Sequence, residues 1–138
     1  MLARNSYSKA YIDDCRALVD AQLAAYKALK LTSASAFECL FFNNLVVVLD
    51  RLFVHRTRGR EGKGGNALNE VRMLCDSILE NKGILAANDV IKYDPAKSVV
   101  KLAIGSEIKL TQADFARLSK AFFEEIETKF TSAASNAR

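Results

Sequence analysis

Several polar side chains that can carry acid–base or anion chemistry lie in an otherwise apolar part of the chain. If residues 37–56 form a helix with about 100° of turn per residue, five of them share two adjacent stripes of that helix. These residues are Asn43 and Asp50 on one stripe, and Asn44, Arg51 and His55 on the next. An unpaired amide or charge that becomes buried costs roughly 1–3 kcal/mol, so each of these groups needs a partner.

Complementary polar groups follow on the next predicted helix, at Asn69, Glu70 and Arg72. Two interpretations are open. In one, these groups form a satisfied polar network that fixes the register of two packed helices. In the other, the same groups line the mouth of a pocket.

His55 is the only histidine of the chain and a candidate general base, with Asp50 or Glu70 as its carboxylate partner. The alternative is a helix-capping or surface histidine. The sequence places no Ser or Cys beside His55 as a nucleophile. Helical ribonucleases of the HEPN type separate their Arg and His by more residues than Arg51 and His55 are separated here. A small enzyme is therefore one of three functional alternatives.

The chain's excess of positive charge is concentrated in one window. Between positions 51 and 63 there is one acid, Glu61, and there are five basic residues: Arg51, Arg56, Arg58, Arg60 and Lys63. This window carries a charge of +4, which equals the net charge of the whole chain. The distribution predicts a local surface for anions and argues against a wholly basic nucleic-acid-binding protein.

Glycines and a helix-capping residue follow these basic residues, with four glycines between positions 59 and 65 and then Asn66. Exposed backbone amides and the start of a helix both favour a phosphate. The loop lacks a Ser or Thr after Lys63, so it is not a Walker A motif, and it has no interleaved aromatics to stack bases. A solvated connection is the open alternative. The predicted ligand-binding residues are Arg56, Arg58, Arg60, Lys63, Asn66, Asn69 and Arg72.

Helical periodicity and capping signals predict four helices. The first spans 8–30, and the second spans 37–56 behind a capping box of Ser35 and Glu38. We expect no regular structure in 57–65. The third helix begins after Asn66, with Leu68, Val71, Leu74, Cys75, Ile78 and Leu79 facing inward, and it stops at Gly83.

The C-terminal part predicts a change of structure and then a final helix. Residues 90–110 read as two or three short strands, with a turn or a short helix at Asp94-Pro95. Thr111 and Asp114 cap the last helix, whose inner stripe is Phe115, Leu118, Phe122, Ile126 and Phe130. Residues 131–138 read as a disordered tail. The expected fold is mainly α (α+β): one domain, 1–138, built as a four-helix bundle with a small β-hairpin or meander before the last helix.

The composition is that of a globular protein. Half of the residues are hydrophobic and 26% are charged. Cys15, Cys39 and Cys75 lie far apart without zinc-ligand spacing, so free thiols are expected, and neither a metal nor a cofactor is. Polar residues interrupt the most apolar run, 37–54, which argues against a membrane span. We therefore expect a cytoplasmic protein, and the nearly all-round apolarity of the second helix favours a homodimer.

Three stretches resemble a family of short actinobacterial proteins of unknown function. They are 53–77, which contains the glycine-rich loop, the segment Asp94-Pro-Ala-Lys-Ser-Val, and the last helix, 114–130. The resemblance implies a cytoplasmic actinobacterial protein, and it carries no functional residues with it. The leading functional hypothesis is a binding module for a nucleotide, a phosphate or a nucleic-acid backbone. The alternatives are a protein-interaction or homo-oligomerisation module and a small enzyme using His55.

Overall fold

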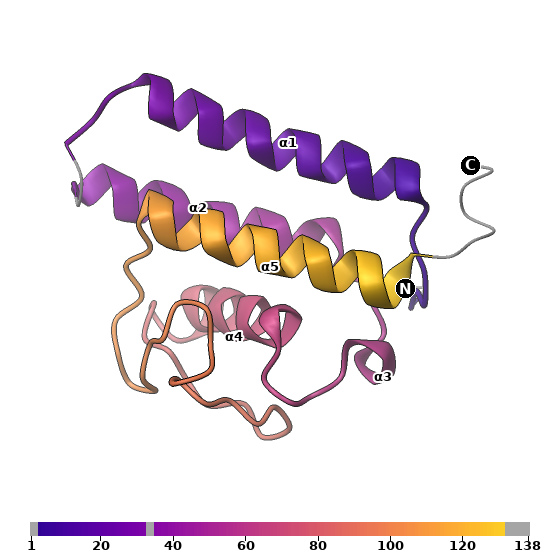
Figure 1. Ribbon diagram of the computed structural model, residues 1–138. Helices are drawn as coiled ribbons and strands as arrows, with labels where there is room; N and C mark the ends of the chain where they lie inside the picture. Colours follow the sequence, from indigo (N-terminus) through magenta and orange to yellow (C-terminus); the bar gives the residue numbers. More distant parts are fainter. Residues whose placement is uncertain (1–2, 33–34, 132–138) are drawn as a thin grey trace.

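The computed structural model describes residues 3–32 and 35–131, which form five helices. They are α1 (Lys9–Ala28), α2 (Ala36–Leu52), α3 (Arg58–Glu61), α4 (Ala67–Glu80) and α5 (Gln112–Phe130). Figure 1 shows three layers, with α1 on one side, α2 and α5 in the middle, and α4 on the other side with α3 and the segment 81–111. Since α5 packs against each of the other four helices, it is the centre of the bundle.

The four long helices begin at the residues that the sequence predicts. The Ser8 and Ser35 hydroxyls accept hydrogen bonds from the amides of Tyr11 and Glu38. Full capping boxes, in which each side chain binds the other residue's amide, open α4 and α5. The Glu38 carboxylate also accepts a hydrogen bond from Gln112 N–H, which joins the start of α2 to the start of α5.

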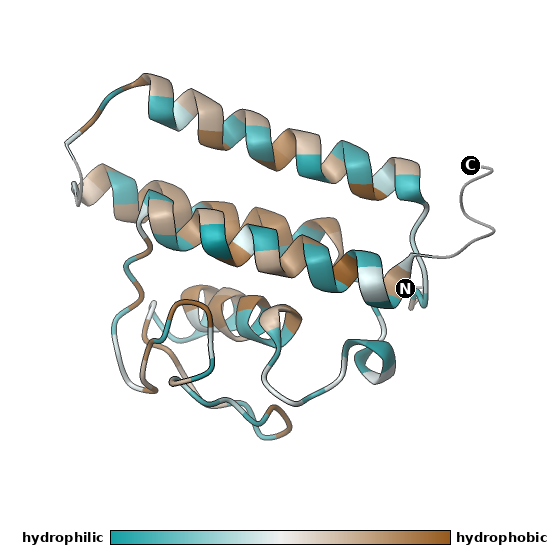
Figure 2. Ribbon diagram, in the orientation of Figure 1, coloured by the Kyte–Doolittle hydropathy of each residue, from teal (hydrophilic) through white to brown (hydrophobic). Residues whose placement is uncertain are grey.

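The core is one cluster built from all four long helices and the segment 81–111. The predicted inner stripe of α5 is confirmed, since all five of its residues are fully buried. Figure 2 shows hydrophobic and hydrophilic residues alternating along α1 and α5, as expected of amphipathic helices. All three cysteines are free thiols; Cys15 and Cys75 are buried and Cys39 is half-buried. Leu79, predicted to face inward, is 60% exposed.

The end of α2 differs from the prediction, because the helix stops at Leu52 instead of continuing to 56. Short turns follow, in which Phe53 N–H donates to Asp50 O and Arg56 N–H donates to Phe53 O. Residues 58–61 then form the single turn α3, in a stretch expected to have no regular structure. After these turns, the side chains of Arg56 and Glu61 both lie buried in the interior.

The predicted β-hairpin or meander is wrong, because residues 90–110 contain no strand. One antiparallel bridge joins Ile84 to Glu107 nearby. Side chains of the neighbouring helices bind the backbone in place of a partner strand. Glu70 of α4 accepts from Val99 and Val100 N–H at 2.8 and 2.9 Å. At Asp94-Pro95, which was left open between a turn and a short helix, the chain forms a turn.

The N-terminal segment runs parallel to the chain after α2. Arg4 N–H donates to His55 O, and Arg4 O accepts from Thr57 N–H. Tyr7 N–H donates to Phe130 O at the end of α5. Of the predicted disordered tail, Thr131 is described and pairs with Tyr7, whereas 132–138 lie outside the described residues. No helix in the described part of the chain is long and apolar enough to cross a membrane.

Asn43 of α2 binds the backbone of the segment 81–111. Its amide donates to Ile108 O at 2.7 Å, and its oxygen accepts from Leu110 N–H at 3.1 Å. We predict that Asn43→Ala lowers the free energy of unfolding by about 1–3 kcal/mol, since both buried backbone groups lose their partner. Urea denaturation measures this loss, and hydrogen exchange should accelerate at Leu110.

The neighbouring residue Asn44 is exposed and provides the matched control. Asn44→Ala should change the free energy of unfolding by no more than about 0.5 kcal/mol. Equal stabilities of the two variants would contradict a fastening role for Asn43.

Candidate functional site

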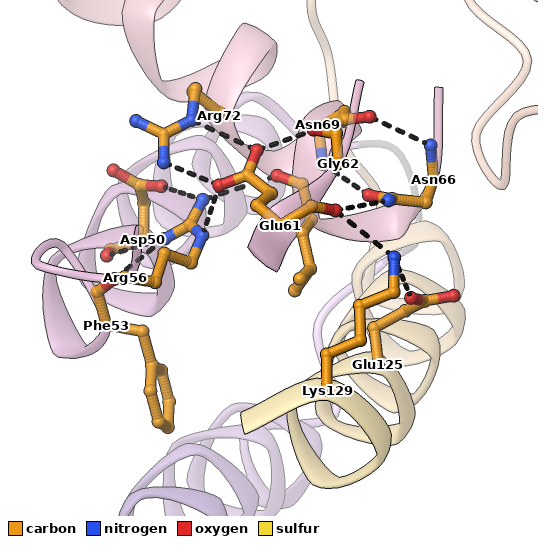
Figure 3. Close-up of polar contacts among 11 residues, drawn as sticks. Asp50, Phe53, Arg56, Glu61, Gly62, Asn66, Asn69, Arg72, Glu125 and Lys129 are labelled. Atoms are coloured by element: carbon orange, nitrogen blue, oxygen red, sulfur yellow. Dashed lines mark hydrogen bonds and ion pairs between the residues drawn. The ribbon is translucent and has the colours of Figure 1, made fainter. Parts of the chain in front are cut away.

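A buried ion network joins the end of α2 to α3 and α4 (Figure 3). The side chain of Arg56 is fully buried and pairs with the carboxylates of Asp50 and Glu61, each at 2.8 Å. It also donates to the carbonyl oxygens of Phe53 and Leu68, at 3.0 and 3.3 Å. Arg56 therefore has its donors occupied by groups of the protein itself.

Glu61 is the shared acceptor of the network and is 1% exposed. Arg72 donates to both of its carboxylate oxygens, at 2.5 and 3.1 Å, and Asn69 donates to one of them at 2.7 Å. Burial alone would raise the pKa of the Glu61 carboxyl. The hydrogen bond from Arg72 and the charges of Arg56 and Arg72 outweigh burial, so its pKa lies below its ordinary value.

Of the seven predicted ligand-binding residues, four are engaged inside the fold. Arg56, Asn69 and Arg72 belong to the ion network, and Asn66 caps α4 while donating to Glu61 O at 2.8 Å. The remaining three, Arg58, Arg60 and Lys63, are exposed. Arg58 and Lys63 line a shallow pocket of about 300 Å³ beside Val90 and Ile91. Arg60 donates to Lys129 O at 3.3 Å.

Neither predicted carboxylate partner is paired with His55. Asp50 binds Arg56, and Glu70 binds the amides of Val99 and Val100. Burial raises the pKa of the Glu70 carboxyl, although its two backbone hydrogen bonds oppose the rise. Burial and the neighbouring charge of Asp50 also raise the pKa of the Cys75 thiol to about 12.

His55 lies in a different environment, a pocket of about 320 Å³ between the N-terminal segment, the start of α1 and the end of α2. We call it the His55 pocket. Its lining comprises Arg4, Tyr7, Ser8, Tyr11, Arg51, Leu52, Val54 and His55. The backbone bonds between Arg4 and His55 and between Arg4 and Thr57 hold the N-terminal segment in place as one wall.

The polar groups of the His55 pocket have unused hydrogen-bonding capacity. Arg4 and Arg51 are exposed, and neither forms an ion pair with any residue of 3–32 or 35–131. Two buried polar atoms in the described chain have no hydrogen-bond partner, Nδ1 of His55 and the hydroxyl of Tyr7, and both residues line this pocket. Since buried polar atoms are rarely left unsatisfied, these two atoms single out the His55 pocket as a candidate site.

The sequence analysis named His55 as a candidate general base, but it missed the N-terminal segment that lines the pocket with it. Arg4, Tyr7 and Tyr11 reach the pocket because this segment folds back against residues 55–57. The spacing of Tyr7 and Tyr11, four residues apart at a helix start, was the signal available for them. Their rings stack with centroids 5.6 Å apart.

The chain matches no protein-family model, no curated protein and no solved structure at a significant level. Within the described residues, no group of three or more His, Cys, Asp or Glu side chains is arranged to hold a metal ion. The His55 pocket itself offers two guanidiniums, an imidazole and aromatic rings.

We predict that Glu61→Gln lowers the free energy of unfolding by about 3–5 kcal/mol at pH 7, because two buried guanidiniums lose their shared negative charge. Glu124→Gln removes the same charge from an exposed position of α5 and is the matched control. Chemical denaturation of both variants measures the difference. Equal unfolding free energies for the two variants would rule out a central role for Glu61.

The lowered pKa of Glu61 also predicts how this difference depends on pH. A carboxylate whose pKa is lower in the folded state stabilises the protein above its ordinary pKa of 4.5. That contribution is lost as the pH falls through the folded-state pKa. The stability difference between wild type and Glu61→Gln should therefore stay constant near neutral pH and shrink in acid below about pH 4.5.

Proposed function

We propose that this protein is a binding module for a small anionic ligand, which occupies the His55 pocket. The observation that carries the proposal is the combination of two unpaired guanidiniums, Arg4 and Arg51, with the unpartnered Nδ1 of His55 in one pocket. Arginine donors suit carboxylate and phosphate oxygens because they bind them in a planar, bidentate way.

The sequence predicted an anionic ligand at the basic, glycine-rich loop. The proposal retains an anionic ligand but assigns it to the neighbouring His55 pocket. The internal bonds of Arg56, Asn69 and Arg72 support this assignment, since they engage these three side chains with groups of the protein itself. Arg51 belongs to the same basic window and remains exposed. The glycine-rich loop, with Arg58 and Lys63, is the competing location.

Two variants that each remove one positive charge distinguish binding at the His55 pocket from binding at the glycine-rich loop. Phosphate and small carboxylates should raise the melting temperature of the wild type at low ionic strength. Arg51→Gln should weaken binding by at least about tenfold, because a hydrogen bond to a charged group contributes roughly 1.5–3 kcal/mol. Arg58→Gln should leave the affinity unchanged. Calorimetric titration measures both, and a loss confined to Arg58→Gln would place the ligand at the loop instead.

The enzymatic alternative receives less support from the geometry. It requires a carboxylate within hydrogen-bonding distance of His55, and no Asp or Glu of the described chain lines the pocket. The ligand-binding proposal needs no such partner. We also propose that the protein is cytoplasmic and that its resemblance to short actinobacterial proteins reflects common ancestry.

A homodimer is a second candidate function, favoured by exposed apolar side chains at one end of α1 and α2. Leu40 is 71% exposed and Phe37 is 48% exposed. Phe37 also stacks on the buried ring of Tyr26 of α1, with ring centroids 6.2 Å apart, so this exposed surface of α2 adjoins α1. An apolar surface of this kind suits a self-complementary interface.

Light scattering after size exclusion tests the homodimer. The wild type should have twice the mass of one chain, and Leu40→Lys should halve that mass, because a charge at the interface opposes association. Leu79→Lys places the same charge on α4, at a leucine that is 60% exposed, and should leave the dimer intact. A wild type that is monomeric at all concentrations would disprove this candidate.

A further inference from the structure

We infer that the ligand of the His55 pocket carries its anionic group on a planar aromatic ring, which stacks against Tyr11. This inference rests on the proposed function and narrows it to a chemical class. The class is a single-ring aromatic acid, whose oxyanion is either a carboxylate or a phosphate.

The aromatic wall of the pocket is already ordered. The Tyr11 hydroxyl donates to Leu52 O at 2.5 Å, which ties the ring of α1 to the end of α2. The ring also stacks on Tyr7 at 5.6 Å and 18°, and it meets the edge of Phe53 at 5.5 Å and 74°. Tyr11 still remains 39% exposed. A ring fixed in this way offers apolar contact area without a loss of side-chain entropy on binding.

Polar and apolar groups both line the pocket, which suits a ligand that carries an oxyanion at one end and an apolar ring at the other. Leu52 and Val54 are half-buried and add aliphatic surface to the two tyrosine rings. Charge is supplied by Arg4 and Arg51, and the guanidinium of Arg4 lies 5.8 Å from the centroid of the Tyr7 ring. The guanidinium of Arg4 therefore lies beside the aromatic wall, and Arg51 lines the same pocket, so an oxyanion attached to a stacked ring has two arginines to bind.

The size of the pocket limits the ligand. At about 320 Å³, the pocket lies near the lower end of the range of roughly 300–1,000 Å³ found for small-molecule sites. One ring and its acidic group suit this volume better than an extended polymer does. The Ser8 hydroxyl oxygen accepts from Tyr11 N–H at 3.1 Å, and its O–H can still donate to a ligand.

Matched pairs of ligands test the inference on the full chain by calorimetric titration. Phenyl phosphate is compared with butyl phosphate, and benzoate is compared with cyclohexanecarboxylate, so that charge is constant while the ring changes. In at least one pair the aromatic member should bind about tenfold more tightly, as expected for a favourable ring–ring contact. The pair with the higher affinity identifies the oxyanion. Ligand ring protons should shift upfield in NMR spectra on binding.

Two variants test whether a preference for the aromatic member of a pair depends on the ring of Tyr11. Tyr11→Leu should abolish the tenfold preference, whereas Phe37→Leu, which removes an exposed stacked ring at the other end of α1 and α2, should retain it. Equal affinities within both pairs would overturn the aromatic inference and leave the anion-binding proposal standing. No binding by any of the four ligands would overturn both. A preference that survives in Tyr11→Leu would also overturn the inference. If Tyr11→Leu does not fold, the wild-type comparison within each pair still decides.

Discussion

The surrounding structure depends on the hydrogen bonds and ion pairs that the carboxylate of Glu61 forms. This carboxylate is buried, and it accepts hydrogen bonds from Arg56, Arg72 and Asn69. A carboxylate removed from water requires such compensation. The chain therefore has to bring α2, α3 and α4 together at this point. The early end of α2, the single turn of α3 and the capped start of α4 all serve this arrangement (Figure 3).

The network also determines which positive charges remain available. Arg56 is turned inward by its bonds to Asp50 and Glu61, whereas Arg51, on the last turn of α2, stays exposed. The turn after α2 presents backbone groups of His55 and Thr57, and the N-terminal segment pairs with them through Arg4. The His55 pocket lies beside this end of α2, and the network uses neither of its guanidiniums, those of Arg4 and Arg51.

In the segment 81–111, hydrogen bonds between helix side chains and the backbone replace the bonds that a neighbouring strand would supply. Asn43 binds Ile108 and Leu110, and Glu70 binds Val99 and Val100. Buried backbone groups need partners, but the partners need not be another strand. This explains why a β-rich composition in 90–110 gave an irregular segment. Most of the apolar residues predicted for strands are still buried or half-buried, with Ile108 and Leu110 in the core, whereas Val90 is 54% exposed.

The sequence by itself determined the parts of the structure that depend on near neighbours. Caps at Ser35, Asn66 and Thr111 and the stripe of α5 could be predicted, because they involve residues within a few positions of one another. The polar network was one of two interpretations, and His55 was named as a candidate functional residue.

Only the tertiary structure decided the direction of each charged side chain. Arg56 and Arg58 belong to the same basic run, yet one is buried among carboxylates and the other is exposed. The meeting of Tyr7 and Tyr11 with His55 likewise depends on contacts between segments far apart in the chain. Burial and partner choice are set by long-range packing, and local patterns carry no information about which distant group will arrive.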